Sequence, residues 1–438
     1  MTDLKDIKKE LETVDTTKIF FVDFNGRIMN LPVNPDNIES ILENGIGFDG
    51  SSIAGYGTVD SSDRLLFPDA DSFKVLRFSD ENVGFIIASV YDEKDKPSQT
   101  DPRAILKKTL AEAEREFGVK FLVGPEHEFF LLNINNGKKQ KKLHTDQGLY
   151  FQSSPHDKGE AVRNRIVKIL KDCGIAFEKA HHEVTPSQHE INLEPADPLN
   201  SADRTVLFNY VTQETAADFG YRATFMPKPF DGYNRNALHL HLSGQDLDGN
   251  NVFYDKDADF NLGTIARQFI GGIVKYARET SIIMASTYNS YKAYVSEREA
   301  PIICNWGLKN RSTMIRIPYC PDPQSTRLEL RSPDPAGNVY LQIAILIAMG
   351  IEGIRNKIDC GEHAVGNICG DGLSAKVWDK RFLPKSMFEA LVEAERSSFL
   401  QQALGDETYH NFMSLKTREW EEHRTHVTNR EISMYLDR

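Results

Sequence analysis

The segment FLVGPEHEFFLL, residues 121–132, is the starting point for the architecture of this chain. Its alternating aromatic and aliphatic residues predict a buried strand, and Gly124-Pro125 predicts a kink or bulge just before the acids. Glu126 and Glu128 are two residues apart, and on a strand this spacing directs both side chains to one face. Two such carboxylates repel each other unless a proton, an arginine or a metal lies between them. By itself, the segment also fits an exposed strand edge with solvated acids.

Three further segments repeat this division into a polar and an aliphatic face. In order, they are Glu190, Asn192 and Glu194 among aliphatics, His239 and His241 within NALHLHLSG (236–244), and Arg327, Glu329 and Arg331 within TRLELRSPDP (326–335). A histidine on such a face is more often structural than a ligand when no other polar group points there. An antiparallel sheet with its aliphatic face against helices and its polar face lining a cavity explains all four segments. The cavity is expected to contain Glu126, Glu128, Glu183, Glu190, Glu329, His239 and His241.

Five carboxylates in one desolvated cavity require counter-charge. Carboxylates with a minority of imidazoles suit Mg²⁺ or Mn²⁺, and two sites of three ligands each would use most of the set. Phosphoryl transfer is then indicated by a cationic wall matched to phosphate and carboxylate groups, formed by Arg311, Arg316, Arg327 and Arg331. The chain has neither a P-loop nor a Rossmann glycine motif. The residues alone therefore predict a two-metal phosphoryl-transfer or hydrolytic enzyme, while a glycosidase pair would not need five acids.

The remaining sequence predicts two domains, at residues 1–100 and 101–438. The first reads as a short helix followed by strands, with a hairpin turn at Asn25-Gly26 and a loop over 45–57. A helix begins at Asp101-Pro102 and ends at Gly118. Further helices are expected over 201–219, 336–358 and 386–404, the last beginning with a capping box of Ser386 and Glu389.

Composition narrows the class of protein. A net charge of −12 over 438 residues argues against a general nucleic-acid or anionic-membrane binder. The most apolar run, at 341–350, is too short to span a bilayer, and the charged start does not resemble a signal peptide. The five cysteines show no C-x-x-C pair and fit a reducing compartment. We expect a cytoplasmic protein that binds neither nucleic acid nor membrane.

Once assembled, these segments resemble type I glutamine synthetases of bacteria and archaea over essentially the whole chain. The matching stretches are FDGSSIAGY (48–56), GPEHEFF (124–130), HHEVTPSQHEINL (181–193), FMPKPF (225–230), HLHLS (239–243), EAP (299–301), NRSTMIRIP (310–318) and RLELRSPDPAGNVYL (327–341). The resemblance implies an α+β fold with a small N-terminal β-grasp domain and a large catalytic domain whose curved antiparallel sheet is packed by helices. It also implies a double-ring homo-dodecamer with active sites between subunits.

The resemblance assigns the ligands of two Mg²⁺ or Mn²⁺ ions and the groups that bind ATP. One metal site would be Glu128, Glu183 and Glu190, and the other Glu126, His239 and Glu329. His241 and Ser243 would lie along the ATP phosphates, with Arg311, Arg316 and Arg327 near the transferred phosphoryl group. The implied reaction is ligation of glutamate and ammonia, in which ATP phosphorylates the γ-carboxylate and ammonia then attacks the acyl phosphate.

The amino-acid substrate and ammonium would contact a further set of residues. Asn234, Arg235, His239 and Arg331 match the acid side of the pocket, with Arg331 holding the substrate carboxylate. Glu299 matches a flap glutamate that takes a proton from ammonium. The ammonium pocket would comprise Asp49, Ser52, Asp63 and Tyr150, with the Asp49 loop donated by the adjacent subunit.

The acid side of the pocket departs from the family at two positions. The family has N-G-S-G-M-H where this chain has NRNALH (234–239), so Arg235 replaces a glycine. The family has Y-K-R-L-V-P-G-Y-E-A-P where this chain has YKAYVSEREAP (291–301), so Ala293 replaces an arginine. Either Arg235 or Arg298 supplies the lost charge and glutamate remains the substrate, or the chain is a paralogue ligating another acid.

The sequence is also compatible with an amine ligase of the γ-glutamyl-amine synthetase type, and with a non-catalytic regulatory paralogue. The tyrosine that is adenylylated in one subgroup of the family has no counterpart after Gly366-Asn367-Ile368-Cys369. We therefore expect no adenylylation.

Overall fold

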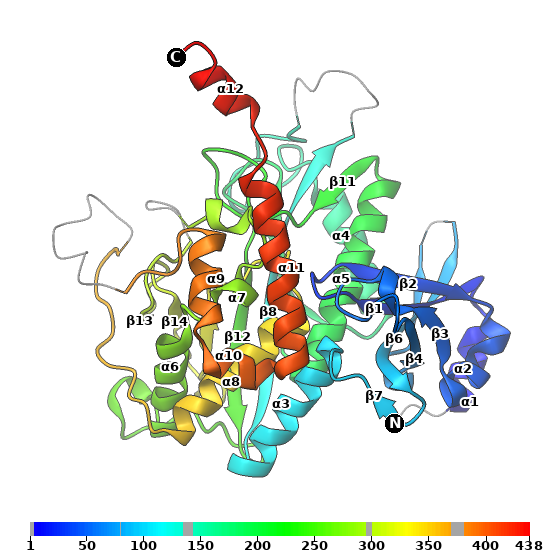
Figure 1. Cartoon of the computed structure of the whole chain (residues 1–438), viewed down its shortest axis with the longest axis horizontal. Helices are drawn as coiled ribbons and strands as arrows, with labels where there is room; N and C mark the ends of the chain where they lie inside the picture. Colours follow the sequence, from blue (N-terminus) through cyan, green and yellow to red (C-terminus); the bar gives the residue numbers. More distant parts are fainter. Residues whose placement is uncertain (1–3, 79, 135–142, 295–299, 369–380) are drawn as a thin grey trace.

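The computed structural model describes residues 4–78, 80–134, 143–294, 300–368 and 381–438 (Figure 1). A first sheet, built from the N-terminal segment, has the strand order β2-β1-β6-β4-β3, with β5 and β7 also paired to β6. Its β1–β6 pair is parallel and its other pairs are antiparallel. The strands are β1 Thr16–Val22, β2 Ile28–Val33, β3 Ile46–Asp49, β4 Asp63–Pro68, β5 Lys74–Arg77, β6 Asn82–Glu93 and β7 Lys96–Pro97. The helices α1 Leu4–Leu11 and α2 Ile38–Asn44 accompany them.

A second sheet carries the polar faces expected from the sequence. Its order is β13-β14-β15-β12-β8-β10-β9, with β11 also paired to β8. The long strand β8 (Lys120–Asn133) is central to it, because it pairs with β12, β10 and β11. The other strands are β9 Phe177–His182, β10 Gln188–Leu193, β11 Tyr221–Thr224, β12 Leu238–Gln245, β13 Trp306–Leu308, β14 Ile315–Ile317 and β15 Leu328–Leu330. The sheet is antiparallel as predicted, except that β13 and β14 run parallel.

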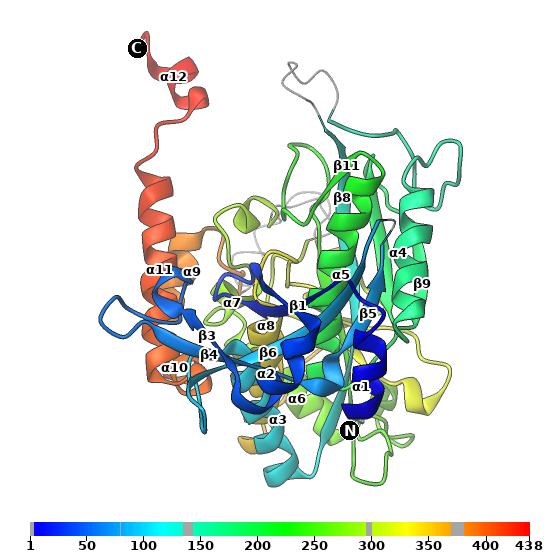
Figure 2. The ribbon, with the colours of Figure 1, turned by 90° about the vertical axis from the view of Figure 1, so that its right-hand side faces the viewer.

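Helices cover the side of this sheet that faces away from the polar rows. The ring of His127, on β8, lies 4.2 Å from that of Phe208 on α5, so the odd-numbered residues of β8 face the helix layer. Figures 1 and 2 show α11 running along the outside of this layer and α12 projecting beyond it to the C-terminus. The helices are α3 Pro102–Phe117, α4 Glu160–Asp172, α5 Pro198–Asp218, α6 Thr264–Tyr276, α7 Ser281–Met284, α8 Val339–Arg355, α9 Met387–Glu395, α10 Ser398–Leu404, α11 Asp406–Arg424 and α12 Asn429–Tyr435.

The two sheets share one continuous hydrophobic core. Phe20 on β1 stacks on Phe85 of β6 and also contacts Tyr210 of α5, across the boundary between the sheets. The turn between β1 and β2 is tied to the start of α8, because Asn338 Nδ2 donates to the Asp23 carbonyl over 2.8 Å. At Gly26 (φ +78°), a Cβ would lie 2.4 Å from the Gly337 carbonyl oxygen, so only glycine allows this contact.

Three details differ from the sequence predictions. Part of the predicted loop over 45–57 is the strand β3, which pairs with β4. The kink or bulge predicted at Gly124-Pro125 does not interrupt the β12 side of β8, where the register runs without a shift from Lys120 to His127. On the other side the register moves by one residue between the Glu126–Asn192 pair and the Val123–Ala196 bridge, so the extra residue lies in the segment opposite β8. Pro125 lies between the pairing of Glu126 with Asn192 and the bridge of Val123 with Ala196, so neither pairing requires its missing N–H.

The third difference concerns the single helix predicted over 386–404, which is two helices. The Ser397 hydroxyl accepts a hydrogen bond from the Leu400 amide and thereby begins α10. The Ser386 cap of α9 is present, but its partner Glu389 accepts from the amide of Lys385 instead of completing the capping box. Among the described residues, no helix is long and apolar enough to cross a membrane.

Candidate active site

Three rows of side chains cross the polar face of the second sheet and build the site. The strand register fixes each row, because residues directly opposite each other on paired strands point to the same side. The rows are Arg316–Glu329–His241, then His239–Glu126–Asn192–Lys179, and finally Glu128–Glu190–His181. The prediction that acids and histidines from four strands share one face is therefore confirmed for Glu126, Glu128, Glu190, His239, His241 and Glu329, while the arginine in these rows, Arg316, comes from a further strand, β14.

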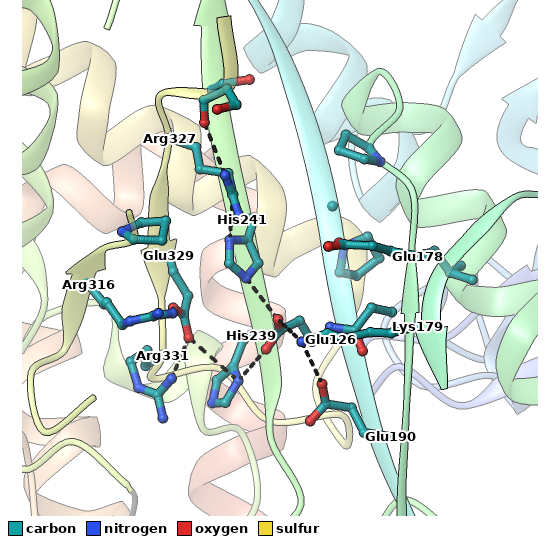
Figure 3. A pocket seen from close by; sticks show the side chains of 18 of the residues that line it. Glu126, Glu178, Lys179, Glu190, His239, His241, Arg316, Arg327, Glu329 and Arg331 are labelled. Carbon is teal, nitrogen blue, oxygen red and sulfur yellow. Dashed lines mark hydrogen bonds and ion pairs between the residues drawn. The ribbon is translucent and has the colours of Figure 1, made fainter. Parts of the chain in front are cut away.

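Glu126 lies at the centre of the face and is held by two histidines (Figure 3). Its two oxygens lie 3.0 Å from His239 Nδ1 and 3.0 Å from His241 Nε2. His241 Nδ1 accepts from Arg327 Nε over 3.1 Å, so the His241 proton is on Nε2, facing Glu126. Burial by itself would raise the pKa of Glu126, but the hydrogen bonds from His239 and His241 outweigh burial and lower it.

Glu329 is the second acid of this region and is buried between arginines. It contacts the guanidinium groups of both Arg316 and Arg331. Burial opposes ionisation here too, yet Arg331 and the two histidines lower the pKa of Glu329 to about 2. The pKa of His239 is lowered by burial and by Arg331, which favours the neutral imidazole that can bind a metal.

A second cluster of acids lies on the other side of Glu126. His181 is 3.4 Å from Glu190 and 3.5 Å from Glu183, so its ring lies between the two carboxylates. Glu128 accepts hydrogen bonds from the Gln188 side chain at 3.0 Å and from the Ala237 amide at 2.9 Å. Burial, and then the charges of Glu183 and Glu190, raise the pKa of Glu128 well above its usual value.

These donor sets fit divalent cations. Ligand atoms of His181, Glu183 and Glu190 lie within 4.8 Å of one another, as do those of Glu126, His241 and Glu329. Burial is the main cause of the raised pKa of Glu128, and the charges of Glu183 and Glu190 raise it further; a divalent ion beside these acids would offset their repulsion. These two groups of neighbouring ligand atoms differ from the sequence assignment by one residue each. His181 takes the place of Glu128 in one group, and His241 takes the place of His239 in the other. All four side chains lie on the same face of the sheet.

Both clusters open into one cavity of about 490 Å³, a size typical of small-molecule sites. Figure 3 shows the labelled arginines and histidines on one wall and Lys179 with Glu190 opposite them. Besides the two clusters, the predicted site residues that line this cavity are Tyr150, Ser243, Arg311, Arg316, Arg327 and Arg331.

A small adjoining cavity contains the two positions that depart from the family pattern. Its volume is about 20 Å³, and Asn234, Arg235, Ala293 and Arg331 all line it. Arg235 is buried, and its guanidinium donates to the main-chain carbonyls of Arg331 and Ser332. The ring of Tyr294 lies 5.6 Å from the same guanidinium. The Arg235 guanidinium is therefore held against the main chain of Arg331 and Ser332, directly after β15.

The predicted ammonium residues of the first sheet lie apart from these cavities. Asp49 and Asp63 are paired across β3 and β4, and both are exposed. Asp49 accepts hydrogen bonds from the hydroxyl groups of Ser51 (2.6 Å) and Ser52 (2.7 Å), which lower its pKa. Neither cavity is lined by Asp49, Ser52 or Asp63. Glu299 and Arg298 lie outside the described residues.

Sequence reasoning missed three side chains that belong to the site. His181 lies between Glu183 and Glu190, Lys179 lies 3.7 Å from Glu126 and 3.8 Å from Glu190, and Gln188 binds Glu128. The signal for His181 was its position opposite Glu190 in a β9–β10 hairpin. Gln188 begins β10 on the same face as Glu190, so alternation could have found it.

Comparison with known proteins gives the family of the chain. Residues 13–93 match the family described as glutamine synthetase, beta-Grasp domain, and residues 99–435 match glutamine synthetase, catalytic domain. The glutamine synthetase of Methanosarcina mazei is 41% identical over 95% of this chain and 93% of the relative. That of Thermotoga maritima is 38% identical over 98% and 97%.

Solved structures agree with this assignment. A GmaS/ADP complex superposes over 100% of both chains with a TM-score of 0.89 and 29% identity. A glutamine synthetase of Plasmodium falciparum, at 23% identity, covers 99% of both chains with a TM-score of 0.87 and so supports the fold. The chain belongs to the glutamine synthetase family, whose members are ligases that form carbon–nitrogen bonds.

Proposed function

We propose that this chain is an ATP-dependent carboxylate–ammonia ligase that converts glutamate and ammonium to glutamine through a γ-glutamyl phosphate. One observation carries the proposal: a single cavity is lined by two carboxylate clusters, placed by the cross-strand rows, and by Arg311, Arg316, Arg327 and Arg331. Membership of the glutamine synthetase family also favours this reaction for the residues that line the cavity.

The carboxylate clusters would hold two Mg²⁺ or Mn²⁺ ions. One would be bound by Glu128, Glu183 and Glu190 and the other by Glu126, His239 and Glu329, with His181 and His241 beside them. Bound cations would neutralise phosphate charge and polarise the reacting oxygens. The lowered pKa values of Glu126, Glu190 and Glu329 support this proposal, because ionised carboxylates bind divalent cations.

The arginines would orient ATP and stabilise the transferred phosphoryl group. The Nε atoms of Arg316 and Arg331 are buried and have no hydrogen-bond partner among the described residues, which supports an anionic ligand in this cavity. We assign Arg311, Arg316 and Arg327 to the phosphoryl group, and His241 and Ser243 to the remaining ATP phosphates. Arg331, which lines both cavities, would bind the carboxylate of the acid substrate.

The ammonium side of the reaction would combine this cavity with a neighbouring subunit. Tyr150 lines the cavity, and the ionised, exposed Asp49 with Ser52 and Asp63 would come from the adjacent copy. An anionic Asp49 attracts ammonium, and Glu299 would accept the proton that ammonium must lose before its nitrogen attacks the acyl phosphate. The released phosphate and ADP balance the consumed ATP.

A homo-dodecamer with shared active sites is part of the same proposal. The C-terminal helix α12 supports self-association, because it projects from the body and leaves Ile432, Met434, Tyr435 and Leu436 exposed (Figures 1 and 2). We also propose the division into domains at 1–100 and 101–438, which the separate sheets support.

The second candidate is a paralogue that ligates another acid or an amine. It is favoured by the small cavity, where Ala293 offers no charge and the Arg235 guanidinium is engaged by two main-chain carbonyls. The similarity to GmaS is compatible with either candidate.

An ADP-release assay with Mg²⁺ separates the candidates. Purified protein is supplied with ATP, one acid from a panel of amino and carboxylic acids, and either ammonium or an amine such as methylamine, ethanolamine or a polyamine. Turnover that needs glutamate and ammonium supports the main proposal. Turnover only with another acid or an amine supports the second candidate, and no nitrogen-dependent turnover with any pair would indicate a non-catalytic paralogue.

A further inference from the structure

The β9–β10 hairpin carries a pair of histidines on the face opposite the cavity. His182 on β9 and His189 on β10 are register partners, and their ring centroids are 5.0 Å apart. Both rings are fully buried. Each histidine precedes an acid of the second cluster, Glu183 or Glu190, so anything that fixes a ring also fixes the backbone of an acid.

Each ring packs on a turn of sequence Asp-x-Gly. In one turn Asp146 Oδ1 accepts from the Gly148 amide at 3.3 Å, and in the other Asp157 Oδ1 accepts from the Gly159 amide at 2.9 Å. A Cβ added to Gly148 would lie 2.5 Å from His182 Nε2, and one added to Gly159 would lie 2.4 Å from His189 Nε2. The two glycines thus allow two similar turns to seat the two rings.

Asp146 connects the first turn to the tip of the hairpin. Its Oδ1 lies 3.1 Å from His182 Nε2 and accepts from the Ser187 amide at 2.9 Å, while its Oδ2 accepts from the Lys158 amide at 3.0 Å. Ser187 lies in the β9–β10 turn at a φ of +66°, and its hydroxyl accepts from the Thr145 amide at 2.7 Å. A single carboxylate therefore holds the ring beside Glu183 and the turn that precedes Glu190.

Asp157 fixes the other ring through an arginine on α4. Arg163 is buried, and it donates to Asp157 Oδ2 at 2.6 Å and to His189 Nδ1 at 2.8 Å. Because arginine only donates, His189 Nδ1 is the acceptor. The chain Asp157–Arg163–His189 therefore ends one residue before Glu190.

These side chains form a hydrogen-bonded scaffold instead of a further metal site. Ligand atoms of Asp146, Asp157, His182 and His189 lie within 4.8 Å of one another, a spacing that a metal would also require. However, both oxygens of each aspartate already accept from N–H groups, and the Arg163 guanidinium lies within the cluster. A divalent cation would have to displace these donors and lie beside a fixed positive charge.

We propose that Asp146 and Asp157 are positioning residues that set the affinity of the Glu183–Glu190 cluster for a divalent cation without touching the cation. This inference rests on the proposed metal-binding function. Partners that orient metal ligands typically change metal affinity about 10–100-fold when they are removed.

The test is direct titration of the full-length protein with Mn²⁺, with free Mn²⁺ followed by electron paramagnetic resonance. Asp146→Asn and Asp157→Asn are each expected to weaken Mn²⁺ binding about 10-fold or more. Asp203→Asn is the matched control, because Asp203 likewise accepts from a buried arginine, Arg103, but lies away from the cavity. It is expected to lower the thermal midpoint while leaving the Mn²⁺ affinity unchanged.

The outcomes separate this inference from the proposed function. If the wild-type protein binds no Mn²⁺, both fail together. If the wild type binds Mn²⁺ and the two aspartate variants bind it equally well, only the positioning role is overturned. Should both variants fail to fold, Ser187→Ala, which removes only a hydroxyl, is expected to weaken binding about 3-fold. Unchanged Mn²⁺ affinity in folded Ser187→Ala would then contradict the proposal.

Discussion

Glu190 illustrates how one side chain of this site depends on its neighbours. It lies opposite Glu128 on one side and His181 on the other, and His181 lowers its pKa although burial opposes ionisation. Lys179, 3.8 Å from Glu190 and 3.7 Å from Glu126, is a single charge shared among several acids, so a further cation would stabilise the ionised cluster, which ties Glu190 to metal binding.

We therefore predict that Glu190→Gln lowers ligase activity more than about 100-fold and weakens Mn²⁺ binding about 10–100-fold, with little loss of stability. Glu178→Gln is the matched control, since Glu178 lines the same cavity but is exposed and outside both clusters. Steady-state ADP release and Mn²⁺ titration measure the two effects. Equal effects of the two substitutions would contradict the assignment of Glu190.

The acid side of the pocket gives a second prediction at this scale. Arg235→Gly removes a buried guanidinium from two carbonyls and is expected to destabilise the fold by about 2–4 kcal/mol, measured by urea unfolding. Combined with Ala293→Arg, it is expected to lower the KM for glutamate, because a guanidinium then faces the small cavity that Ala293 lines.

Ala293→Met in the same background is the control for this pair, because it adds volume without charge. Loss of glutamate activity in the Arg235→Gly, Ala293→Arg double variant would contradict the assignment of the cavity to the acid substrate.

The sequence could predict those site residues whose placement depends on neighbours along the chain, but not those whose placement depends on contacts with distant segments. Alternation along a strand identified Glu126, Glu128, His239 and Glu329, because it needs only local geometry. It could not show that Arg235 bonds to carbonyls nearly a hundred residues away, or that Asp146 supports His182. Such contacts depend on tertiary packing, which one sequence does not encode locally.

At the scale of elements, the first residues of helices were the easiest feature to predict from the sequence. Breaks within a long helix-forming segment, and strands within a glycine-rich segment, were the hardest. Asp101-Pro102 begins α3 as expected, because the cap and the proline act locally. The break at Ser397 was missed, since both halves of 386–404 are good helix formers and only the Ser397 hydroxyl marks the new start. Likewise, β3 was hidden in a glycine-rich segment and exists because β4 pairs with it.

The α3 cap also gives a pH-dependent prediction. Burial raises the pKa of Asp101 to about 6, although the amides of Val90 and Arg103 both donate to it. Between the unfolded pKa of about 3.9 and about 6, the folded protein keeps a proton that the unfolded chain has lost. The favourable contribution of protonated Asp101 is therefore present at low pH and is lost as the pH rises through about 6. The full difference is about 3 kcal/mol, about half of it above pH 5.

Urea unfolding of wild type and Asp101→Asn between about pH 5 and pH 7.5 measures this effect. The stability of the wild type relative to the variant is expected to fall as the pH rises. Asp197→Asn is the matched control for the loss of a capping carboxylate, because Asp197-Pro198 likewise begins α5 but Asp197 is exposed. A constant difference for Asp101→Asn would contradict the burial argument.

At the scale of the whole molecule, one core joins two sheets while the proposed catalytic groups divide between them. The metal and phosphate residues lie on the second sheet, and Asp49 and Asp63 lie exposed on the first. The sequence predicted both sheets and the family, but only the proposed assembly would bring an Asp49 to the cavity of a neighbouring copy.

The C-terminal arm tests that assembly. α12 begins with a complete capping box of Thr428 and Glu431, and Leu436 at its end is 75% exposed. We predict that Ile432→Ser with Leu436→Ser reduces the assembly to smaller species in mass photometry, because apolar contact area is lost. Arg430→Ala on the same helix is the control. An unchanged mass distribution in the double variant would mean that α12 has no part in assembly.

Transfer of an oxygen isotope tests the proposed reaction most directly. Glutamate labelled with ¹⁸O in its γ-carboxylate is incubated with the protein, ATP, Mg²⁺ and ammonium, and the released phosphate is examined by mass spectrometry. Attack of that carboxylate on ATP, followed by attack of ammonia on the acyl phosphate, predicts one ¹⁸O in each phosphate released with glutamine. Phosphate released without ¹⁸O, or ADP formation that does not require ammonium, would contradict a carboxylate–ammonia ligase acting through an acyl phosphate.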